Sequence, residues 1–474
     1  MITAKSELAL PKADIGVLGE IFLGLLVVDG WSAYFKVICE QQSCMAHLLR
    51  KIRKFRDAFP NLTSIVKFYL KLRRILRDGE RLQKIREQIG EEVFERRLKR
   101  LKKRLEGIRR SVRNKIEKID SAYYRVKLPQ ILTDSTHGEM HYFELVTARI
   151  ADSDGAEGVG YTYAVNHGGA SIHAMIDRDL NGHLIGEDPG RIEALWEKMW
   201  WAIHYPGRGG IASFAIAAID IALWDLMGHK TDLPLWRLLG GHNPKVPAYA
   251  GGIDLLKPLP ELIEQTDRNL NNGFRAIKMK VGRPNLSEDV ERVAAMRCHL
   301  GQDFPLMADA NMHWSRDEAL KACQALRDYS LFWIEEPLIP EDETGHAMLA
   351  TAGGIPIAAG ENFRTIHEFA RLIRAEGVMF PEPDVSNCGG ITPWMKIAAL
   401  AECNNLKVTS HGVHDLHVHL LAAVPNKSYL EVHGFGLERY IADPLSIEEG
   451  FATAPVTPGH GVVFDWDALE KMRV

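Results

Sequence analysis

Between positions 246 and 433 the hydrophobic residues form short, continuous runs, each followed by polar side chains and then by a stretch of helical spacing. Continuous apolar runs are typical of strands that are buried on both faces, as in a parallel sheet. The pattern predicts eight strands, at 246–253, 276–281, 305–311, 331–337, 355–361, 378–386, 407–412 and 429–433. The sequence therefore predicts an α/β fold with a (β/α)8-type barrel.

Three of these runs end in acidic residues at a constant interval. Asp309, Glu335 and Glu361 are 26 positions apart, about one strand plus one helix. In a parallel barrel the carboxyl ends of the strands gather at one mouth, so these side chains converge. One such acid alone is most often a surface residue, but three in register require a cation between them. Oxygen ligands favour Mg2+, and we predict a magnesium site here.

Candidate bases lie on both sides of this site. Lys278 and Lys280 are two apart on a strand and share a face. Asp384 and His411 end the sixth and seventh strands, so a hydrogen bond between them would fix the imidazole tautomer. A lysine base must be neutral, and we expect Lys278 and the metal to lower the pKa of Lys280. This arrangement suits proton abstraction next to a substrate carboxylate.

The remaining sequence divides the chain further. Residues 114–245 contain strands followed by helices and are predicted to form an α+β capping domain, with residues 434–474 packing back on it. Two loops, around 135–141 and 163–169, could reach over the barrel mouth. The barrel itself spans 246–433. Residues 1–113 are predicted to be a mostly helical basic appendage.

The charge is uneven along the chain. Residues 1–120 carry 28 basic and 15 acidic side chains, whereas the remainder carries 30 and 47. A basic face could bind nucleic acid. Acidic residues are interleaved throughout, which favours a solvated amphipathic helix pair and makes a nucleic-acid partner unlikely.

Composition argues against a secreted, membrane-bound or disulfide-stabilised protein. Residues 15–28 are apolar but contain Glu20 and are too short to span a bilayer, so neither a signal peptide nor a membrane partner is expected. The six cysteines are scattered, which favours a reducing, cytoplasmic location over a disulfide framework. Cys39, Cys44 and His47 lack an evident fourth metal ligand.

Several motifs together carry a family resemblance. They are Lys278-x-Lys280, Asp309-x-Asn311, Glu335-Glu336-Pro337, Gly360-Glu361-Asn362, Asp384, His411 and Glu431. In order and separation they resemble the mandelate racemase subgroup of the enolase superfamily over residues 114–474. The resemblance implies that Asp309, Glu335 and Glu361 bind Mg2+ and that Lys280 and His411 move protons on opposite faces of the substrate. Glu431 would hydrogen-bond the substrate carboxylate.

The run from Gly389-Gly390-Ile391-Thr392-Pro393 through Leu416-His417-Val418-His419-Leu420 resembles acid-sugar dehydratases of the talarate/galactarate type. Asn362, which follows the third metal-binding Glu, is instead the residue found in racemases. We therefore expect a sugar-acid dehydratase, with a racemase or epimerase of a 2-hydroxy acid as the alternative. The resemblance also implies a homo-oligomer, from dimer to octamer. The candidate substrate-binding residues are Thr136, His137, Tyr163, His167 and Asn311. His414, His417 and His419 are expected to be structural.

A second resemblance lies near the start of the chain. Val27-Val28-Asp29-Gly30 and the residues after it resemble a fragment of an insertion-element transposase, in which Asp29 would be a metal ligand. One carboxylate cannot hold the two metals that phosphoryl transfer needs, so no transposase activity is expected. A catalytically inactive fusion whose basic N-terminus binds nucleic acid is a further alternative.

Overall fold

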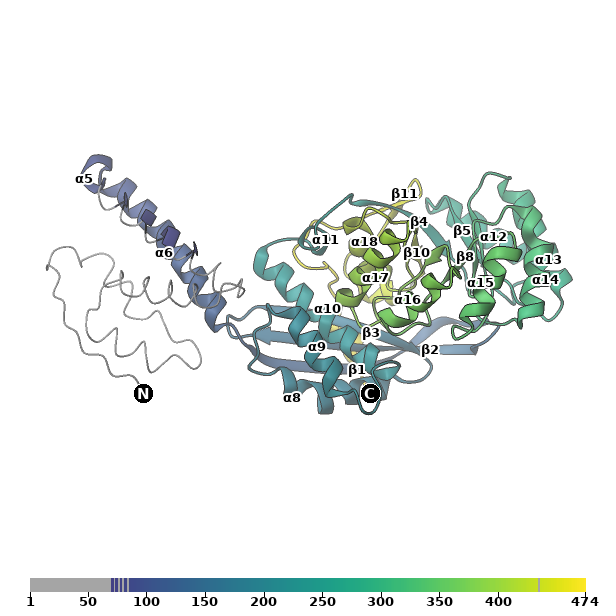
Figure 1. The fold of residues 1–474 in the computed structure, drawn as a ribbon, viewed down its shortest axis with the longest axis horizontal. Coiled ribbons are helices and arrows are strands. Elements are labelled where there is room, and N and C mark those ends of the chain that lie inside the picture. The colour runs from purple at the N-terminus through teal and green to yellow at the C-terminus, as the bar shows by residue number, and fades with distance from the viewer. Residues whose placement is uncertain (1–69, 72, 76, 79–80, 83–84, 434) are drawn as a thin grey trace. The chain divides into compact units, whose positions relative to one another are not determined.

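The computed structural model describes residues 70–71, 73–75, 77–78, 81–82, 85–433 and 435–474. The chain forms two compact units, Met1–Asn114 and Lys115–Val474 (Figure 1). The hypotheses about Asp29, the apolar stretch 15–28 and the Cys39, Cys44 and His47 group lie outside the described residues.

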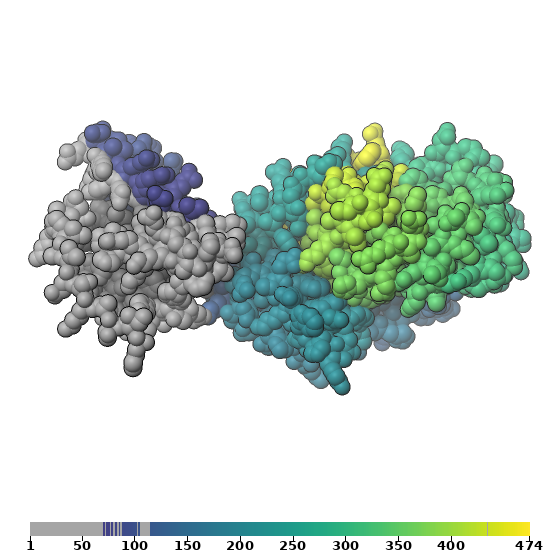
Figure 2. All heavy atoms as spheres, viewed as in Figure 1, coloured from purple at the N-terminus to yellow at the C-terminus, as the bar shows by residue number. Residues whose placement is uncertain are grey.

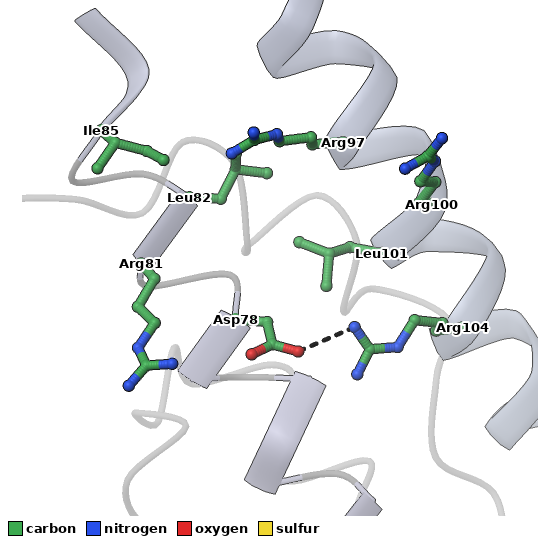
Figure 3. A pocket seen from close by; sticks show the side chains of 8 residues that line it. All are labelled: Asp78, Arg81, Leu82, Ile85, Arg97, Arg100, Leu101 and Arg104. Carbon is green, nitrogen blue, oxygen red and sulfur yellow. Dashed lines mark hydrogen bonds and ion pairs between the residues drawn. The ribbon is translucent and has the colours of Figure 1, made fainter. Parts of the chain in front are cut away.

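In the first unit, α5 (Arg86–Ile89) and α6 (Glu91–Arg113) are separated by Gly90, whose φ of 74° interrupts the helix. Phe94, Leu98 and Leu101 of α6 are buried at helical spacing. Beside them lies a cavity of about 260 Å3 (Figure 3), lined by Asp78, Arg81, Leu82, Ile85, Arg97, Arg100, Leu101 and Arg104. Its four arginines are exposed to solvent, as in the amphipathic helix pair that the sequence favours.

The second unit begins with an antiparallel sheet and the helices that cover it, which together are called the cap below. β1 (Ile116–Asp134), β2 (Gly138–Asp152) and β3 (Glu157–Val165) pair in chain order. The helical segments are α7 (Gly169–Ala174), the π-helical η1 (Met175–Leu180), α8 (Asn181–Leu184), α9 (Ile192–Ala202), α10 (Ile211–Thr231) and α11 (Leu235–Leu238).

The cap is built around α10. Among the described residues this helix is long and apolar enough to cross a membrane, but 78% of that stretch is buried inside the unit. β3 lies close to it because Gly160 has no side chain: a Cβ there would be 2.0 Å from Ala218 O. In the space-filling view the teal residues of α9 and α10 lie against the yellow-green residues of α17 (Ile391–Cys403) (Figure 2). This contact joins the cap to the barrel.

Parallel strands form the second part of the unit. They are β4 (Lys245–Gly251), β5 (Ile277–Lys280), β6 (Leu306–Asp309), β7 (Ile334–Glu335), β8 (Ile357–Ala359), β9 (Phe380–Pro381) and β10 (Leu430–Val432). β4 to β9 pair in chain order, and β10 pairs with β4. Val408 bridges to Lys427, and the Thr409 N–H donates to Pro381 O over 2.9 Å. These bonds complete a ring of eight parallel segments, so the predicted barrel is confirmed.

Helices follow the strands around the barrel. They are α12 (Leu259–Asn271), α13 (Leu286–Leu300), α14 (Arg316–Leu326), α15 (Glu343–Ala352), α16 (Ile366–Arg374), α17 and α18 (His414–Ala423), with the 3-10 turn η2 (Arg327–Tyr329) after α14. The large side chains of Tyr249, Met307 and Trp333 fill the interior. The interior is therefore a packed core, and the polar strand ends lie at its mouth.

The segment after residue 434 contacts both parts of the unit. It contains η3 (Leu437–Tyr440), β11 (Ile447–Glu448), β12 (Phe451–Thr453) and α19 (Trp466–Glu470). β12 pairs with barrel strand β4. The last residues return to the cap, where the Arg125 N–H donates to Met472 O over 2.9 Å and the Val474 N–H donates to Tyr123 O over 3.0 Å.

Candidate active site and metal centre

Three carboxylates meet where β6, β7 and β8 end. Asp309 lies opposite both Lys280 and Glu335 in the parallel register, and Glu361 follows β8. Oxygen atoms of the three carboxylates lie within 4.8 Å of one another, and all three side chains are buried. Glu361 Oε2 receives no hydrogen bond from the described residues. Three buried carboxylates whose oxygens converge in this way fit a hard divalent cation such as Mg2+.

Two lysines of β5 contact these acids. Lys280 Nζ donates to Asp309 Oδ2 over 2.5 Å. Lys278 Nζ contacts Glu335 and lies 2.7 Å from Glu431 Oε1. Both lysines are buried, and both reach the acidic centre from one face of the strand, as alternation along a strand predicts.

The charges of the protein determine the pKa values here. Burial raises the pKa of Asp309, but Lys280 and Lys278 lower it to about 2. Burial lowers the pKa of Lys280, but Asp309, Glu361 and Glu335 outweigh burial and the charge of Lys278, so this pKa is raised. Lys278 lowers the pKa of Lys280 as expected, whereas three carboxylates raise it; the prediction also included a metal ion, so it stays a prediction. A divalent cation on the same carboxylates would oppose their effect.

The second base lies on the other side of the carboxylates. His411 Nδ1 is 3.0 Å from Asp384 Oδ2, and His411 Nε2 is 3.2 Å from Glu361 Oε2. Burial lowers the pKa of His411, but Glu361, Glu431 and Asp384 raise it to about 10. The sixth and seventh strands thus bring Asp384 and His411 together, as neighbouring barrel strands should.

Glu431 connects the two sides. Its Oε1 contacts Lys278, and its Oε2 accepts a hydrogen bond from the Gly412 N–H over 2.9 Å. His433 Nε2 lies 3.9 Å from Glu431 Oε2. His411, Glu431 and His433 also form a group of potential ligand atoms within 4.8 Å of one another.

Two residues that sequence reasoning assigned to substrate binding have other contacts. The Thr136 hydroxyl donates to Asn311 O, and Tyr163 OH donates to Asp384 Oδ2 over 3.0 Å. These hydroxyls connect the cap to the barrel, and their assignment to substrate binding stays a prediction. The sequence did not indicate this because the partners are 175 and 221 residues away.

The other three candidate substrate-binding residues are placed differently. His137 Nδ1 is 2.7 Å from Asp134 Oδ2 at the tip of the β1–β2 hairpin. Asn311 is buried at the barrel mouth, with its Oδ1 receiving no hydrogen bond from the described residues. His167 is exposed and, within the described part of the chain, its side chain has no hydrogen bond or ion pair. Its neighbour Asn166 instead fixes the hairpin by accepting from the His141 N–H over 3.0 Å.

Sequence reasoning assigned no role to three polar residues at the site. Glu336 accepts from Asn362 Nδ2 over 2.6 Å, and burial raises its pKa to about 8. Glu382 is fully buried, and neither carboxyl oxygen has a hydrogen-bond partner among the described residues. His433 is the third. Glu382 precedes Asp384 by two positions and His433 follows Glu431 by two, so strand alternation could have found both.

Two of the three histidines after His411, His417 and His419, make hydrogen bonds to the main chain. His417 Nε2 accepts from the Val385 N–H over 3.0 Å, and its Nδ1 is 2.8 Å from Gly412 O. His419 Nε2 is 3.0 Å from His460 O, in the buried core. These rings make hydrogen bonds to the main chain, as expected.

A closed parallel barrel with a cap, a three-carboxylate centre and flanking bases defines a barrel enzyme with a divalent-metal centre. The chain belongs to the mandelate racemase/muconate lactonizing enzyme family of the enolase superfamily. Residues 124–240 match the mandelate racemase/muconate lactonizing enzyme N-terminal domain, and residues 261–468 match the enolase C-terminal domain-like model. Residues 12–138 match the IS66 transposase family, in agreement with the second resemblance.

Named relatives act on acid sugars. The chain is 56% identical to 3,6-anhydro-alpha-L-galactonate cycloisomerase of Streptomyces coelicolor over 76% of this chain and 99% of the relative. It is 40% identical to L-talarate/galactarate dehydratase of Salmonella typhimurium over 65% of this chain and 77% of the relative.

Solved structures show the same fold with magnesium. A racemase from Streptomyces coelicolor with bound magnesium has a TM-score of 0.74 and 55% identity, covering 76% of this chain and 100% of the other. L-talarate dehydratase from Polaromonas with Mg and L-glucarate has a TM-score of 0.73 and 35% identity, covering 76% and 98%. The cofactor of these homologues agrees with the predicted Mg2+.

Proposed function

We propose that the enzyme removes the proton alpha to the carboxylate of a sugar acid and eliminates the oxygen at C3, with a 3,6-anhydro sugar acid as the preferred substrate. The observation that carries the proposal is the placement of Lys280 and of the His411–Asp384 pair on opposite sides of the three carboxylates. An elimination needs a base that takes the proton from C2 and an acid that gives a proton to the leaving oxygen. Groups on both sides of the centre can fill these two roles.

Asp309, Glu335 and Glu361 would hold Mg2+. When bound, the ion stabilises the negative charge that develops on the substrate carboxylate. The proton transfers are carried out by side chains of the protein.

Lys280 Nζ takes the proton from C2, and the electron pair of the C–H bond forms a C2–C3 double bond. The C3–O bond breaks, and its electron pair stays on the oxygen, which takes a proton from His411 Nε2. Glu431, held by Lys278 and the Gly412 N–H, faces the substrate carboxylate. The enol then takes a proton at C3 and becomes a 2-keto-3-deoxy acid.

The fate of the oxygen separates ring opening from dehydration. A 3,6-anhydro ring keeps its oxygen attached through C6, so the product is an isomer of the substrate. A free C3 hydroxyl leaves as water. The 56% identity with a cycloisomerase over nearly its whole length favours ring opening. Dehydration of an aldaric acid is the second candidate, supported by the 40% identity with a dehydratase.

The test is incubation in D2O with Mg2+, followed by proton NMR and mass spectrometry. The substrates are 3,6-anhydro-L-galactonate, galactarate, L-talarate and mandelate. We expect the anhydro acid to give a keto product that has lost no water and carries deuterium at C3. A product from galactarate or L-talarate that has lost one water would establish the dehydratase instead. Deuterium exchange with inversion and no keto product would contradict both and indicate a racemase.

A further inference from the structure

A second group of potential metal ligands lies beside the three carboxylates. His411 Nε2 and His433 Nε2 are each 3.9 Å from Glu431 Oε2, and each of the three residues has a ligand atom within 4.8 Å of the other two. His411 Nε2 is also 3.2 Å from Glu361 Oε2, so this group adjoins the carboxylate centre. His433 takes no part in the proposed elimination, which leaves its place at the site to be explained.

The seventh and eighth strands bring these three side chains together. Glu431 and His433 are two positions apart at the end of β10, so both side chains leave the strand on one face. The Glu431 N–H donates to Ser410 Oγ over 3.1 Å. This bond ties the segment that carries His411 to the strand that carries Glu431. The group is therefore built into the barrel and does not depend on a surface loop.

Both imidazole rings are held in place by other side chains. His411 Nδ1 lies 3.0 Å from Asp384 Oδ2, which leaves Nε2 as the ring atom that faces Glu431. A carboxylate on the second nitrogen is the usual partner of a histidine that binds a metal, because it orients the ring. The His433 ring packs edge-on against Phe435, with the ring centroids 4.4 Å apart. Little ordering of side chains is therefore needed before an ion can bind.

Two imidazoles and one carboxylate form a different donor set from three carboxylates. Mg2+ prefers oxygen ligands, whereas imidazole nitrogen suits zinc and other divalent transition ions. Two His and one Glu, with water in the fourth position, are a known ligand set for Zn2+. Tetrahedral ligand atoms at about 2.1 Å from zinc stand roughly 3.4 Å apart. The two contacts of 3.9 Å would close to this value by a movement of about half an ångström.

We propose that His411, Glu431 and His433 form a site for a divalent transition ion, best matched by Zn2+, next to the Mg2+ centre. An ion at this site uses His411 Nε2 and a carboxylate oxygen of Glu431 as ligands. In the proposed function, the first of these atoms gives a proton to the leaving oxygen and Glu431 faces the substrate carboxylate. Zinc at the site therefore stops turnover. The binding of zinc is independent of the proposed function, and only this inhibition rests on it.

Calorimetry on the full chain, with excess Mg2+ and without substrate, tests the binding of zinc. His433→Gln keeps the approximate size of the side chain but removes the imidazole, so it should weaken zinc binding at least about 10-fold. Asp309→Asn alters the Mg2+ centre and should leave zinc binding unchanged. The matched control is His167→Ala, which removes an exposed histidine and should also have no effect. Zinc binding that is lost in Asp309→Asn but kept in His433→Gln would overturn the proposal, as would the absence of zinc binding to the wild type.

A wild-type crystal soaked in zinc locates the ion by anomalous scattering and needs no variant. We expect an ion bonded to His411, Glu431 and His433 at about 2.0–2.2 Å. Zinc found only at the three carboxylates, or only at cysteines, would overturn the proposal.

Inhibition is measured separately in the NMR assay of the wild type. Zinc should block turnover, and a large excess of Mg2+ should not restore it, because the two ions use different ligands. Recovery with Mg2+ would place the inhibitory zinc on the carboxylates and contradict the proposal. If no sugar acid turns over even without zinc, the proposed function fails, whereas calorimetry and the crystal still decide whether the zinc site exists.

Discussion

Replacing Asp384 with Asn tests whether the carboxylate controls the state of His411. Asp384 is fully buried, and four donors point at it. Its Oδ2 accepts from His411 Nδ1 and Tyr163 OH, each over 3.0 Å. Its Oδ1 accepts from the N–H and hydroxyl of Ser386, over 2.8 and 2.7 Å. The side-chain amide of Asn has the same shape but only one acceptor atom. It therefore cannot accept from both the His411–Tyr163 pair of donors and the Ser386 pair.

The fixed main chain decides how the amide turns. The Ser386 N–H cannot rotate away, so the amide oxygen should face Ser386 and the NH2 group should face His411. The imidazole must then accept at Nδ1 and carry its proton on Nε2, and it loses the carboxylate that stabilises its charged form. Loss of a positioned acid or base lowers a rate by about 10² to 10⁴. The lost charged hydrogen bonds should also cost about 1–3 kcal/mol of folding free energy.

The assay separates the two half-reactions in D2O. In Asp384→Asn we expect cleavage of the C3–O bond to fall by about 10² to 10⁴, while exchange of the proton at C2, which depends on Lys280, continues. The control is Ser386→Ala, which removes one donor to Oδ1 and leaves the His411 side intact. If Asp384→Asn cleaves the bond within about threefold of the wild-type rate, or Ser386→Ala is equally slow, the carboxylate does not act through His411.

Four further predictions concern stability and the appendage. Burial raises the pKa of Asp220 to about 7, although hydrogen bonds from Thr392 oppose this rise. The folded state therefore keeps this proton to a higher pH than the unfolded state does. The free energy of unfolding should fall as the pH rises from about 4 to 7, by at most about 4 kcal/mol. Urea unfolding of Asp220→Asn across this range should lack that slope. Gly160→Ala should lower the free energy of unfolding by about 2 kcal/mol or more, because its Cβ would lie 2.0 Å from main-chain oxygen. Deleting residues 1–113 should leave kcat/KM and the oligomeric state unchanged, as measured by NMR assay and light scattering. EDTA should abolish turnover and lower Tm, and Mg2+ should restore both.

Each of these has an outcome that would contradict it. Asp220→Asn showing the same pH slope as the wild type would mean that other groups cause it. For Gly160, the control is Gly182→Ala in α8, where a Cβ meets nothing within 4 Å and a gain of about 0.5–1 kcal/mol is expected. A change of activity or of oligomeric state after the deletion would show that residues 1–113 act on the enzyme. Turnover that persists in EDTA would remove the metal from the mechanism.

The parts of the site that lie on one strand, or on adjacent strands, could be predicted from sequence. Asp309, Glu335 and Glu361 each end a buried apolar run, and the parallel register places such positions side by side. The pairing of Asp384 with His411 follows from the same rule. Local pattern carries this information because strand alternation and strand order determine where a side chain points.

Contacts between the cap and the barrel could not be predicted in this way. The hydroxyls of Thr136 and Tyr163 bond to barrel residues that lie far away in the chain, which the sequence did not indicate. No periodicity connects such positions. The three carboxylates that raise the pKa of Lys280 were not foreseen for a related reason, because their number around the ammonium group is set in three dimensions.

The same long-range contacts decide which reaction the barrel performs. Proton removal at C2 requires only the metal centre and one base, and it is common to racemisation, dehydration and ring opening. These outcomes differ in whether an oxygen can leave from C3 and whether an acid meets it. Because Tyr163 joins the cap to the Asp384–His411 pair, a substrate whose far end reaches the cap would also act on the position of the acid. Substrates that vary only at that far end should therefore change both binding and the ratio of elimination to exchange.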